Sequence, residues 1–217
     1  MCRGNATGMD DPEDFSSEKQ RQILRGAATI FAREGYEGAS MSQIASEAGV
    51  SKGTLYNYFT SKADLFSTYI ADECSQRIAC VFGDGIKEDE LETAMRDIAH
   101  RILKLLLSEH GLTTHRIVIS EALKFPELAR TFHEAGPARA VRIMADWLDR
   151  QRQRGQLRLE DPYFAAEQFF ALLNTRVVPL RRLQLLSADS AAAEVDRVVD
   201  ASVAMFLRFY GTENTGR

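Results

Sequence analysis

The sequence has little cysteine and no long apolar run, and both absences narrow the classes of protein to consider. Three cysteines, Cys2, Cys74 and Cys80, occur in 217 residues, too few and too irregularly spaced for a disulfide framework or a metal-ligand motif. No apolar stretch approaches the roughly 18 residues of a membrane-spanning helix. The polar, acidic first 18 residues lack the apolar core of a signal peptide. We therefore expect a cytoplasmic protein with reduced cysteines and without a metal, cofactor or membrane as its partner.

Familiar catalytic motifs are also missing. The histidines are His100, His110, His115 and His133, and no two of them stand three or four residues apart, as two metal ligands on one helical face would. The chain contains no G-x-S-x-G nucleophile elbow, no phosphate-binding loop and no G-x-G-x-x-G dinucleotide fingerprint. We therefore do not expect an enzyme, and a helical enzyme is kept only as an alternative from a different functional class.

Charge is unevenly distributed along a chain whose formal net charge is −4. Residues 1–18 hold one basic and five acidic side chains, whereas residues 19–62 hold six basic and three acidic ones. A basic segment within an otherwise acidic protein is where a phosphate-binding surface is expected. The excess is small and also fits an ordinary solvated face, so it supports nucleic-acid binding only together with a motif.

Helical periodicity dominates the sequence after its polar beginning. Alternation typical of strands is absent, so we expect an all-α protein. A disordered tail is predicted for residues 1–17, where Gly, Asn, Asp and Pro dominate. Helices are predicted over about 17–33, 40–48, 51–59, from 61 onward, 91–105, 113–124, 127–135, 137–154, 161–186 and 190–210.

The segment 40–66 has the properties of a helix-turn-helix. Ser40, followed three residues later by Gln43, forms a capping-box pattern at the start of one helix. Gly49 stands at the turn, where the backbone needs the positive φ that glycine adopts at low cost. Ser51 then provides the N-cap of a second, very short helix. The spacing predicts two helices held at an angle by a tight turn.

The second of these short helices has two different sides. Its apolar residues Val50, Leu55 and Phe59 are expected to pack on the preceding helices. Its polar residues carry hydroxyls, an amide, a cation and two phenols, which are groups that contact phosphates and base edges. These polar residues are Ser51, Lys52, Thr54, Tyr56, Asn57 and Tyr58. The pattern predicts a recognition helix for the major groove of DNA.

The stretch IASEAGVSKGTLYNYFTSKADL, from Ile44 to Leu65, resembles the DNA-binding domain of the TetR family of bacterial regulators. The upstream FAREGYEG also fits, and Asp161–Leu186 has a softer resemblance to the AcrR-like members. The resemblance implies an all-α, homodimeric transcription regulator, most often a repressor, that binds a palindromic operator in double-stranded DNA. It implies release by a small, largely apolar effector. The expected domains are a tail at 1–17, a helix-turn-helix domain at 18–65 and an effector-binding and dimerisation domain at 66–217.

Carried over position by position, the resemblance implies a set of DNA contacts. The N-terminal amides of the first short helix approach phosphate, Gly53 lets the backbone approach closely, and Lys62 contacts the DNA backbone. The complete set is Ser40, Ser42, Ser51, Lys52, Gly53, Thr54, Tyr56, Asn57, Tyr58 and Lys62. The family usually has His where Tyr58 stands, which leaves the base preference there open. Asn57 either reads adenine through its amide or is simply solvated.

The resemblance also implies a dimer interface on the last two helices. These helices carry more apolar surface than one face of a monomer needs. The predicted interface residues are Leu172, Leu173, Leu183, Leu186, Phe206 and Phe209. The alternative is that these side chains fill the core of the monomer.

A ligand pocket in the C-terminal domain is implied by the resemblance as well. The predicted lining residues are His115, Ile119, Phe132, Trp147, Phe170 and Asn174, and ordinary core packing is the alternative for each of them. Arg116 and Arg176 are expected in apolar surroundings, where an arginine needs a partner. That partner is either a carboxylate such as Glu121 or an anionic ligand.

One alternative keeps the fold and changes the role. A helical adaptor could bind DNA mainly to position another protein, using the acidic surface outside residues 19–62. A regulator should protect one short palindrome, whereas an architectural protein should bind many sites with little effect on transcription.

Overall fold

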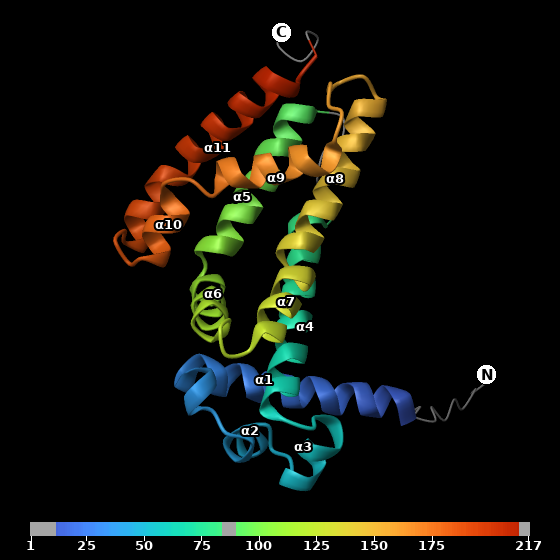
Figure 1. Cartoon of the computed structure of the whole chain (residues 1–217), viewed down its shortest axis with the longest axis vertical. Helices are drawn as coiled ribbons and strands as arrows, with labels where there is room; N and C mark the ends of the chain where they lie inside the picture. The colour runs from blue at the N-terminus through green and yellow to red at the C-terminus, as the bar shows by residue number, and fades with distance from the viewer. Residues whose placement is uncertain (1–11, 84–89, 213–217) are drawn as a thin grey trace, which may run out of the picture. The chain divides into compact units, whose positions relative to one another are not determined.

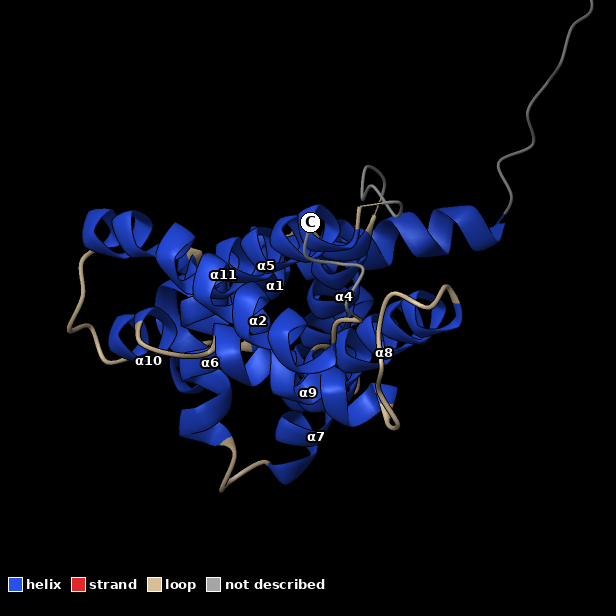
Figure 2. Cartoon of the chain, turned by 90° about the horizontal axis from the view of Figure 1, so that it is seen from above, coloured by secondary structure: helices blue, strands red, loops and turns tan. Residues whose placement is uncertain are grey.

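A computed structural model describes residues 12–83 and 90–212 and divides the chain into two compact units after Tyr69. Figure 2 draws the regular elements of this described part as helices, and the isolated backbone bridge within it joins Leu157 to Gly211. The predicted all-α class is confirmed. Over the same residues, no helix has the length and apolar character that crossing a membrane requires.

The first unit is built from three helices and the beginning of a fourth. These are α1 (Pro12–Gly38), α2 (Met41–Glu47), α3 (Lys52–Tyr58) and residues 62–69 of α4 (Lys62–Phe82). The tail predicted for 1–17 is wrong for its last residues, because α1 already begins at Pro12; proline suits the first turn of a helix. Residues 1–11 lie outside the described residues. Gly35 interrupts α1 with a φ of 71°, two residues after the end predicted for this helix.

The core of the first unit is aromatic. The apolar stripe of α1, including Ile23, Ile30 and Phe31, is buried. The ring centroids of Phe31 and Phe66 are 4.5 Å apart in an edge-to-face arrangement, which is favourable for aromatic pairs. These residues recur at helical spacing, so they share one side of α1, and that side faces the core.

Gly26 allows an unusually close approach between α1 and α2. A Cβ atom added to Gly26 would lie 2.7 Å from the Cβ of Ala48 and 2.8 Å from its backbone nitrogen. Backbone atoms cannot move aside as a flexible side chain can, so any larger residue would separate the two helices. This contact sets how closely α2 packs on α1.

The second unit contains the rest of α4 and seven further helices. These are α5 (Leu91–Leu107), α6 (Glu109–Glu121), α7 (Pro126–Ala135), α8 (Pro137–Gln153), α9 (Pro162–Leu173), α10 (Val177–Arg182) and α11 (Ala188–Tyr210). Helix α9 packs against both α8 and α11, and α11 also packs along α5 (Figure 1). The rings of Phe169 and Phe206 meet edge to face at 5.4 Å in the core between α9 and α11.

The single helix predicted for 161–186 is wrong, because the chain breaks after α9. Asp161 accepts hydrogen bonds from the N–H groups of Tyr163 and Phe164 and caps α9, so the helix starts where the predicted one does. The break follows Leu173, and α10 begins only at Val177. Pro179 gives the physical reason, since it has no N–H to donate to residue 175 and its ring would clash with the carbonyl there.

The end of α11 is joined to the connection between α8 and α9. The N–H of Arg158 donates to the carbonyl of Tyr210 at 2.7 Å, and the N–H of Thr212 donates to the carbonyl of Gln156 at 3.2 Å. The hydroxyl of Thr212 also donates to the carbonyl of Gly155 at 3.0 Å. These bonds fasten residues that lie more than fifty positions apart in the sequence.

Candidate DNA-binding surface and ligand cavity

The first short helix, α2, begins with the capping box that the sequence predicts. The hydroxyl of Ser40 accepts from the N–H of Gln43 at 3.3 Å, and the side-chain oxygen of Gln43 accepts from the N–H of Ser40 at 2.9 Å. Both bonds satisfy donors that a helix start otherwise leaves unpaired. The cap fixes the point at which the chain turns into α2.

The turn between α2 and α3 is held from two sides. Gly49 has a φ of 64°, the left-handed conformation predicted for it, and the N–H of Val50 donates to the carbonyl of Ala45 at 3.0 Å. The side chain of Gln22, on α1, donates to the carbonyl of Ala48 at 2.6 Å. The turn is therefore tied to α1, and α3 leaves it in a defined direction.

Helix α3 presents its polar side because its apolar side is buried. Leu55 and Phe59 are almost fully buried, as predicted. The hydroxyl of Ser51 accepts from the N–H of Thr54 at 2.9 Å and lies 2.7 Å from the hydroxyl of that residue. Ser51 therefore serves as the N-cap of α3, and its hydroxyl and that of Thr54 lie together at the N-terminal end of the helix.

Most of the predicted DNA contacts lie on accessible surface of this unit. Seven of them are exposed: Ser40, Ser42, Ser51, Lys52, Gly53, Tyr56 and Asn57. Thr54 and Tyr58 are half-buried at the edge of the same surface. We call this set without Lys62 the recognition surface. It combines two helix N-termini, where N–H groups favour anions, with a side-chain ammonium and two phenols.

Lys62 is a correction to the predicted contacts. Its ammonium group donates to the carbonyls of Tyr36 at 2.7 Å, Ala39 at 2.9 Å and Glu37 at 3.2 Å. It also lies 4.6 Å from the centroid of the Tyr36 ring, within cation–π distance. An ammonium group has three donors, and all three are engaged. Lys62 therefore fastens the start of α4 to the link between α1 and α2 instead of offering its charge to phosphate.

The second unit contains a cavity of about 420 Å³. This volume falls within the range of small-molecule sites. Its wall is mostly apolar and comes from seven helices, α4 to α10. The residues of the wall are Glu73, Cys74, Arg77, Ile78, Ile102, Leu105, Leu106, His110, Gly111, Thr114, His115, Phe132, Gly136, Pro137, Ala140, Val141, Glu167, Phe170, Ala171, Asn174 and Arg182.

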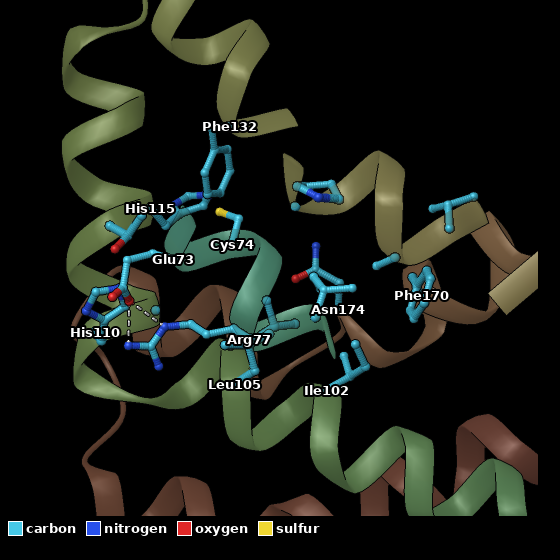
Figure 3. Close-up of a pocket in the computed structure, with 18 of the residues that line it drawn as sticks. Glu73, Cys74, Arg77, Ile102, Leu105, His110, His115, Phe132, Phe170 and Asn174 are labelled. Carbon is cyan, nitrogen blue, oxygen red and sulfur yellow. Dashed lines mark hydrogen bonds and ion pairs between the residues drawn. The ribbon is translucent and has the colours of Figure 1, made fainter. Parts of the chain in front are cut away.

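Four of the predicted pocket residues line this cavity and two do not. His115, Phe132, Phe170 and Asn174 belong to its wall (Figure 3).

Ile119 and Trp147 are corrections to the predicted pocket. Ile119 is 62% exposed and stands one turn after His115, the last residue of α6 in the wall. Trp147 is buried in the core of the unit, together with its neighbours Met144 and Leu148 on α8. The alternative of ordinary packing therefore holds for Trp147, while Ile119 faces solvent.

An ionic cluster occupies one end of the cavity wall. The carboxylate of Glu73 pairs with Nε2 of His110 at 3.0 Å and with the guanidinium of Arg77 at 2.8 Å (Figure 3). The hydrogen bond from His110, with further help from Arg77, lowers the pKa of Glu73 to about 2 despite its partial burial. The carboxylate is therefore charged and compensated at neutral pH. Beside it, burial raises the pKa of the Cys74 thiol to about 11, which keeps that sulfur protonated and a poor nucleophile.

Sequence reasoning missed the cavity residues that come from α4 and α10. The spacing of Glu73 and Arg77 predicts a helical ion pair but does not place it at a cavity. Arg182, at the end of α10, is half-buried, and this burial lowers the pKa of its guanidinium. Burial and, second, the charge of Arg182 lower the pKa of His115. Nothing in the local sequence around Arg182 distinguishes it from a solvated arginine.

Two of the predicted dimer residues are buried within the chain itself. Leu173 is fully buried and Phe206 is 2% exposed, both in the core of the second unit, so neither has side-chain surface to give to a partner. For them the alternative of a monomer core is correct. Phe209 and Leu183 are 75% and 67% exposed. Leu172 and Leu186 are partly buried against the core.

The two arginines expected in apolar surroundings lie at the surface. Arg176 pairs with Glu194 at 2.8 Å and is more than half exposed, and Arg116 is exposed. Glu121, their proposed partner, is buried and accepts from the hydroxyl of Ser120 at 3.4 Å. The predicted pairing with Glu121 is therefore wrong for Arg176, whose partner comes from α11.

Two protein families account for most of the chain. Residues 23–69 match the tetR family of bacterial regulatory proteins. Residues 93–212 match the C-terminal domain of AefR-like transcriptional repressors. The AcrR-like resemblance stays a prediction, since the C-terminal match is to the AefR-like group.

Similar proteins and structures agree with both matches. The transcriptional repressor AcnR of Corynebacterium glutamicum is 28% identical over 193 residues, which cover 88% of this chain and 95% of AcnR. A Mesorhizobium loti protein assigned to the TetR family has a structure with a TM-score of 0.77 at 30% identity, covering 91% of this chain and 98% of that one. The flavonoid-responsive regulator FrrA superposes with a TM-score of 0.76 at 32% identity, covering 91% and 99%. The chain therefore belongs to the TetR family of transcriptional regulators, a family of regulators and not of enzymes.

Proposed function

We propose that the protein is a homodimeric repressor that binds a palindromic operator and is released from it by a small, largely apolar effector. The observation that carries this proposal is the presence of two surfaces in one chain. One is the exposed polar side of α3, and the other is the apolar cavity of about 420 Å³ in the second unit. Repression is supported by AcnR, which is itself named a repressor.

A dimer is supported by apolar side chains left exposed near the end of the chain. Phe209 and Met205 on α11, and Leu183 and Leu185 after α10, are each more than half exposed. Exposed apolar groups of this size gather where a partner covers them. A two-fold dimer would present two copies of a short recognition helix, and the spacing of two half-sites then adds specificity.

Effector release follows from a difference in affinity between two conformations. Helix α4 supplies residues 62–69 to the first unit and Glu73, Cys74, Arg77 and Ile78 to the cavity wall. An effector that binds better to the conformation with low DNA affinity shifts the population toward it. A coupling of about 1–3 kcal/mol would weaken operator binding roughly 5–150-fold.

The DNA arm of the test uses the region upstream of the protein's own gene. We expect footprinting to show one short palindrome and the affinity to fall steeply with salt. The variant Lys52→Gln should weaken binding to all sequences and flatten the salt slope, whereas Lys104→Gln, also at an exposed lysine, should change neither. Substitutions of Thr54 or Tyr58 should change which sequence binds best. Binding to many unrelated sites would favour the architectural adaptor instead.

The effector arm measures operator affinity in the presence of a library of apolar compounds. We expect some of them to release the DNA from the wild-type protein. The variant Ala171→Trp adds an indole to an exposed residue of the cavity wall and should abolish release while operator binding is kept. Leu123→Trp, at a residue 96% exposed and outside the wall, serves as the matched control. Release that survives Ala171→Trp would argue against the cavity as the effector site.

A further inference from the structure

Some charged groups on the cavity wall are compensated within the chain, and one is not. Glu73 is paired with both His110 and Arg77 at distances of 3.0 and 2.8 Å. This cluster has satisfied its charges within the chain and offers little to a ligand. Glu167 also belongs to the wall, but it is exposed and water can solvate its carboxylate.

Arg182 differs from all of these groups. It lines the cavity at the end of α10 and is half-buried, and within residues 12–83 and 90–212 its guanidinium forms no hydrogen bond or ion pair. A charge withdrawn from water without a partner is costly, and burial lowers its pKa accordingly. A guanidinium presents a planar fork of N–H donors that fits two oxygens or one anionic oxygen.

His115 offers a second donor in the same region. It lies on α6, which packs against α10, and it belongs to the same cavity wall. Its ring nitrogens have no hydrogen bond to any described residue. Burial and the charge of Arg182 lower its pKa, so the ring is neutral at neutral pH. A neutral imidazole still donates one N–H and adds no second positive charge beside Arg182.

The helix that carries Arg182 is held between two strained residues. Arg176 before α10 has a φ of 49°, and Gln184 after it has a φ of 59°, in the left-handed region that side chains other than glycine rarely adopt. The ion pair between Arg176 and Glu194 at 2.8 Å and the hydrogen bond from Arg181 to the carbonyl of Leu186 at 2.7 Å hold these ends. Strain of this kind is found where a ligand-contacting element must be placed against local preference.

We infer that Arg182, together with His115 on the same cavity wall, binds an anionic oxygen of the effector, whose apolar body fills the rest of the cavity. The inference rests on the proposed effector role of this cavity and specifies its ligand as an amphiphile that carries a carboxylate or a phenolate. The apolar wall, with Ile102, Leu105 and Phe170, suits the body of such a molecule. Arg182 supplies the charge that an ester or an ether of the same molecule could not use.

The experiment compares each acid with its neutral methyl derivative by calorimetric titration of the full-length protein. One pair is dodecanoate and methyl dodecanoate, and the other is pentachlorophenol, ionised at neutral pH, and pentachloroanisole. We expect at least one anion to bind about 10–100-fold more tightly than its neutral partner, the effect of a charged hydrogen bond in a partly buried site. Preference in the first pair identifies a carboxylate effector, and preference in the second identifies a phenolic one.

Variants of Arg182 test whether this residue causes the preference for the anion over its neutral derivative. Arg182→Met keeps the length of the side chain without its charge and should bind anion and neutral derivative equally, while affinity for the neutral derivative changes less than about threefold. Arg116→Met removes an exposed arginine of α6 outside the wall and should keep the wild-type ratio. Thermal unfolding of each variant checks the fold, and Arg182→Gln replaces Arg182→Met if the latter is unstable.

The possible failures are distinguishable. Equal binding of anions and neutral derivatives to the wild-type protein, or a preference that survives loss of Arg182, would overturn the inference and leave the cavity as an apolar effector site. Absence of binding by both members of both pairs, together with no release by the compound library, would overturn the effector role of the cavity itself.

Discussion

The two units of the chain build their functional surfaces in opposite ways. In the first, short-range hydrogen bonds set the surface: Ser40 pairs with Gln43, and Ser51 pairs with Thr54, each three residues away. In the second, seven helices from α4 to α10 each contribute side chains to one cavity. A surface made by caps and turns can be read from spacing alone, whereas a cavity made by tertiary packing cannot.

The largest effect is expected from the core of the second unit. Phe206→Ala removes a ring that packs edge to face on Phe169 and should lower the free energy of unfolding by about 3–5 kcal/mol. Phe209→Ala, three residues later at a position 75% exposed, should cost little stability in the monomer and should instead weaken the proposed dimer. Denaturant unfolding at two protein concentrations, with sedimentation, separates the effects, because dissociation makes the midpoint concentration-dependent. Equal losses in both variants would place Phe209 in the core as well.

A close backbone contact should have the next largest effect, in the first unit. Gly26→Ala places a methyl group 2.8 Å from the backbone nitrogen of Ala48, and we expect a loss of up to about 3 kcal/mol in stability together with weaker operator binding. Gly53→Ala on α3 meets no atom closer than 3.8 Å and should leave stability unchanged or slightly higher. It should weaken operator binding alone, if the backbone at Gly53 approaches DNA. Thermal unfolding and operator titration of both variants check the contrast.

Substitution of Lys62 tests whether its charge contributes to DNA binding or to the stability of the first unit. Lys62→Gln removes charged hydrogen bonds to the carbonyls of Tyr36 and Ala39, and we expect a loss of about 2 kcal/mol in stability. The salt slope of operator binding should stay close to that of the wild type, because no phosphate contact is lost. Lys52→Gln should show the reverse, with stability kept and a flatter slope. A flatter slope for Lys62→Gln with unchanged stability would restore the direct phosphate contact.

The smallest expected effect concerns the loss of stability of the second unit at acidic pH. The folded pKa of Glu73 is lowered to about 2, so its contribution to stability is complete above the ordinary carboxyl pKa. That contribution is lost as the pH falls from about 4.5 toward 2. The free energy of unfolding of the wild type should decrease over this pH window, and we expect Glu73→Gln to make that decrease smaller by about 1–2 kcal/mol. Urea unfolding at pH 6, 4.5 and 3 measures it, and a decrease identical to that of the wild type would show that the pair with His110 contributes nothing.

The outcome of the sequence predictions follows the same division. The caps at Ser40 and Ser51 and the positive φ at Gly49 are confirmed, because each depends on residues at most a few positions apart. Lys62 could not be assigned correctly, since its acceptors are carbonyls 23 to 26 residues upstream. The sequence does not distinguish a solvated lysine from one that caps another segment.

The second unit shows where periodicity alone is insufficient. The apolar stripe over 161–186 predicts one helix, yet Pro179 breaks it, and proline was the local signal available. Apolar periodicity identified Phe206 as a side chain that needs to be buried. It did not indicate whether the residues that bury it come from the same chain or from a partner. For Arg182, burial depends on how α10 packs on α6, which no spacing within either helix encodes.

The bonds between Gln156, Arg158, Tyr210 and Thr212 have a mechanical consequence for α11. A helix pinned at its last turn can swing but cannot slide along its axis. These bonds therefore oppose displacement of α11 along its own axis relative to the connection between α8 and α9. Because they join backbone groups, these bonds are kept when the side chain of Arg158 or Thr212 is replaced, and only proline at one of these donor positions removes a bond.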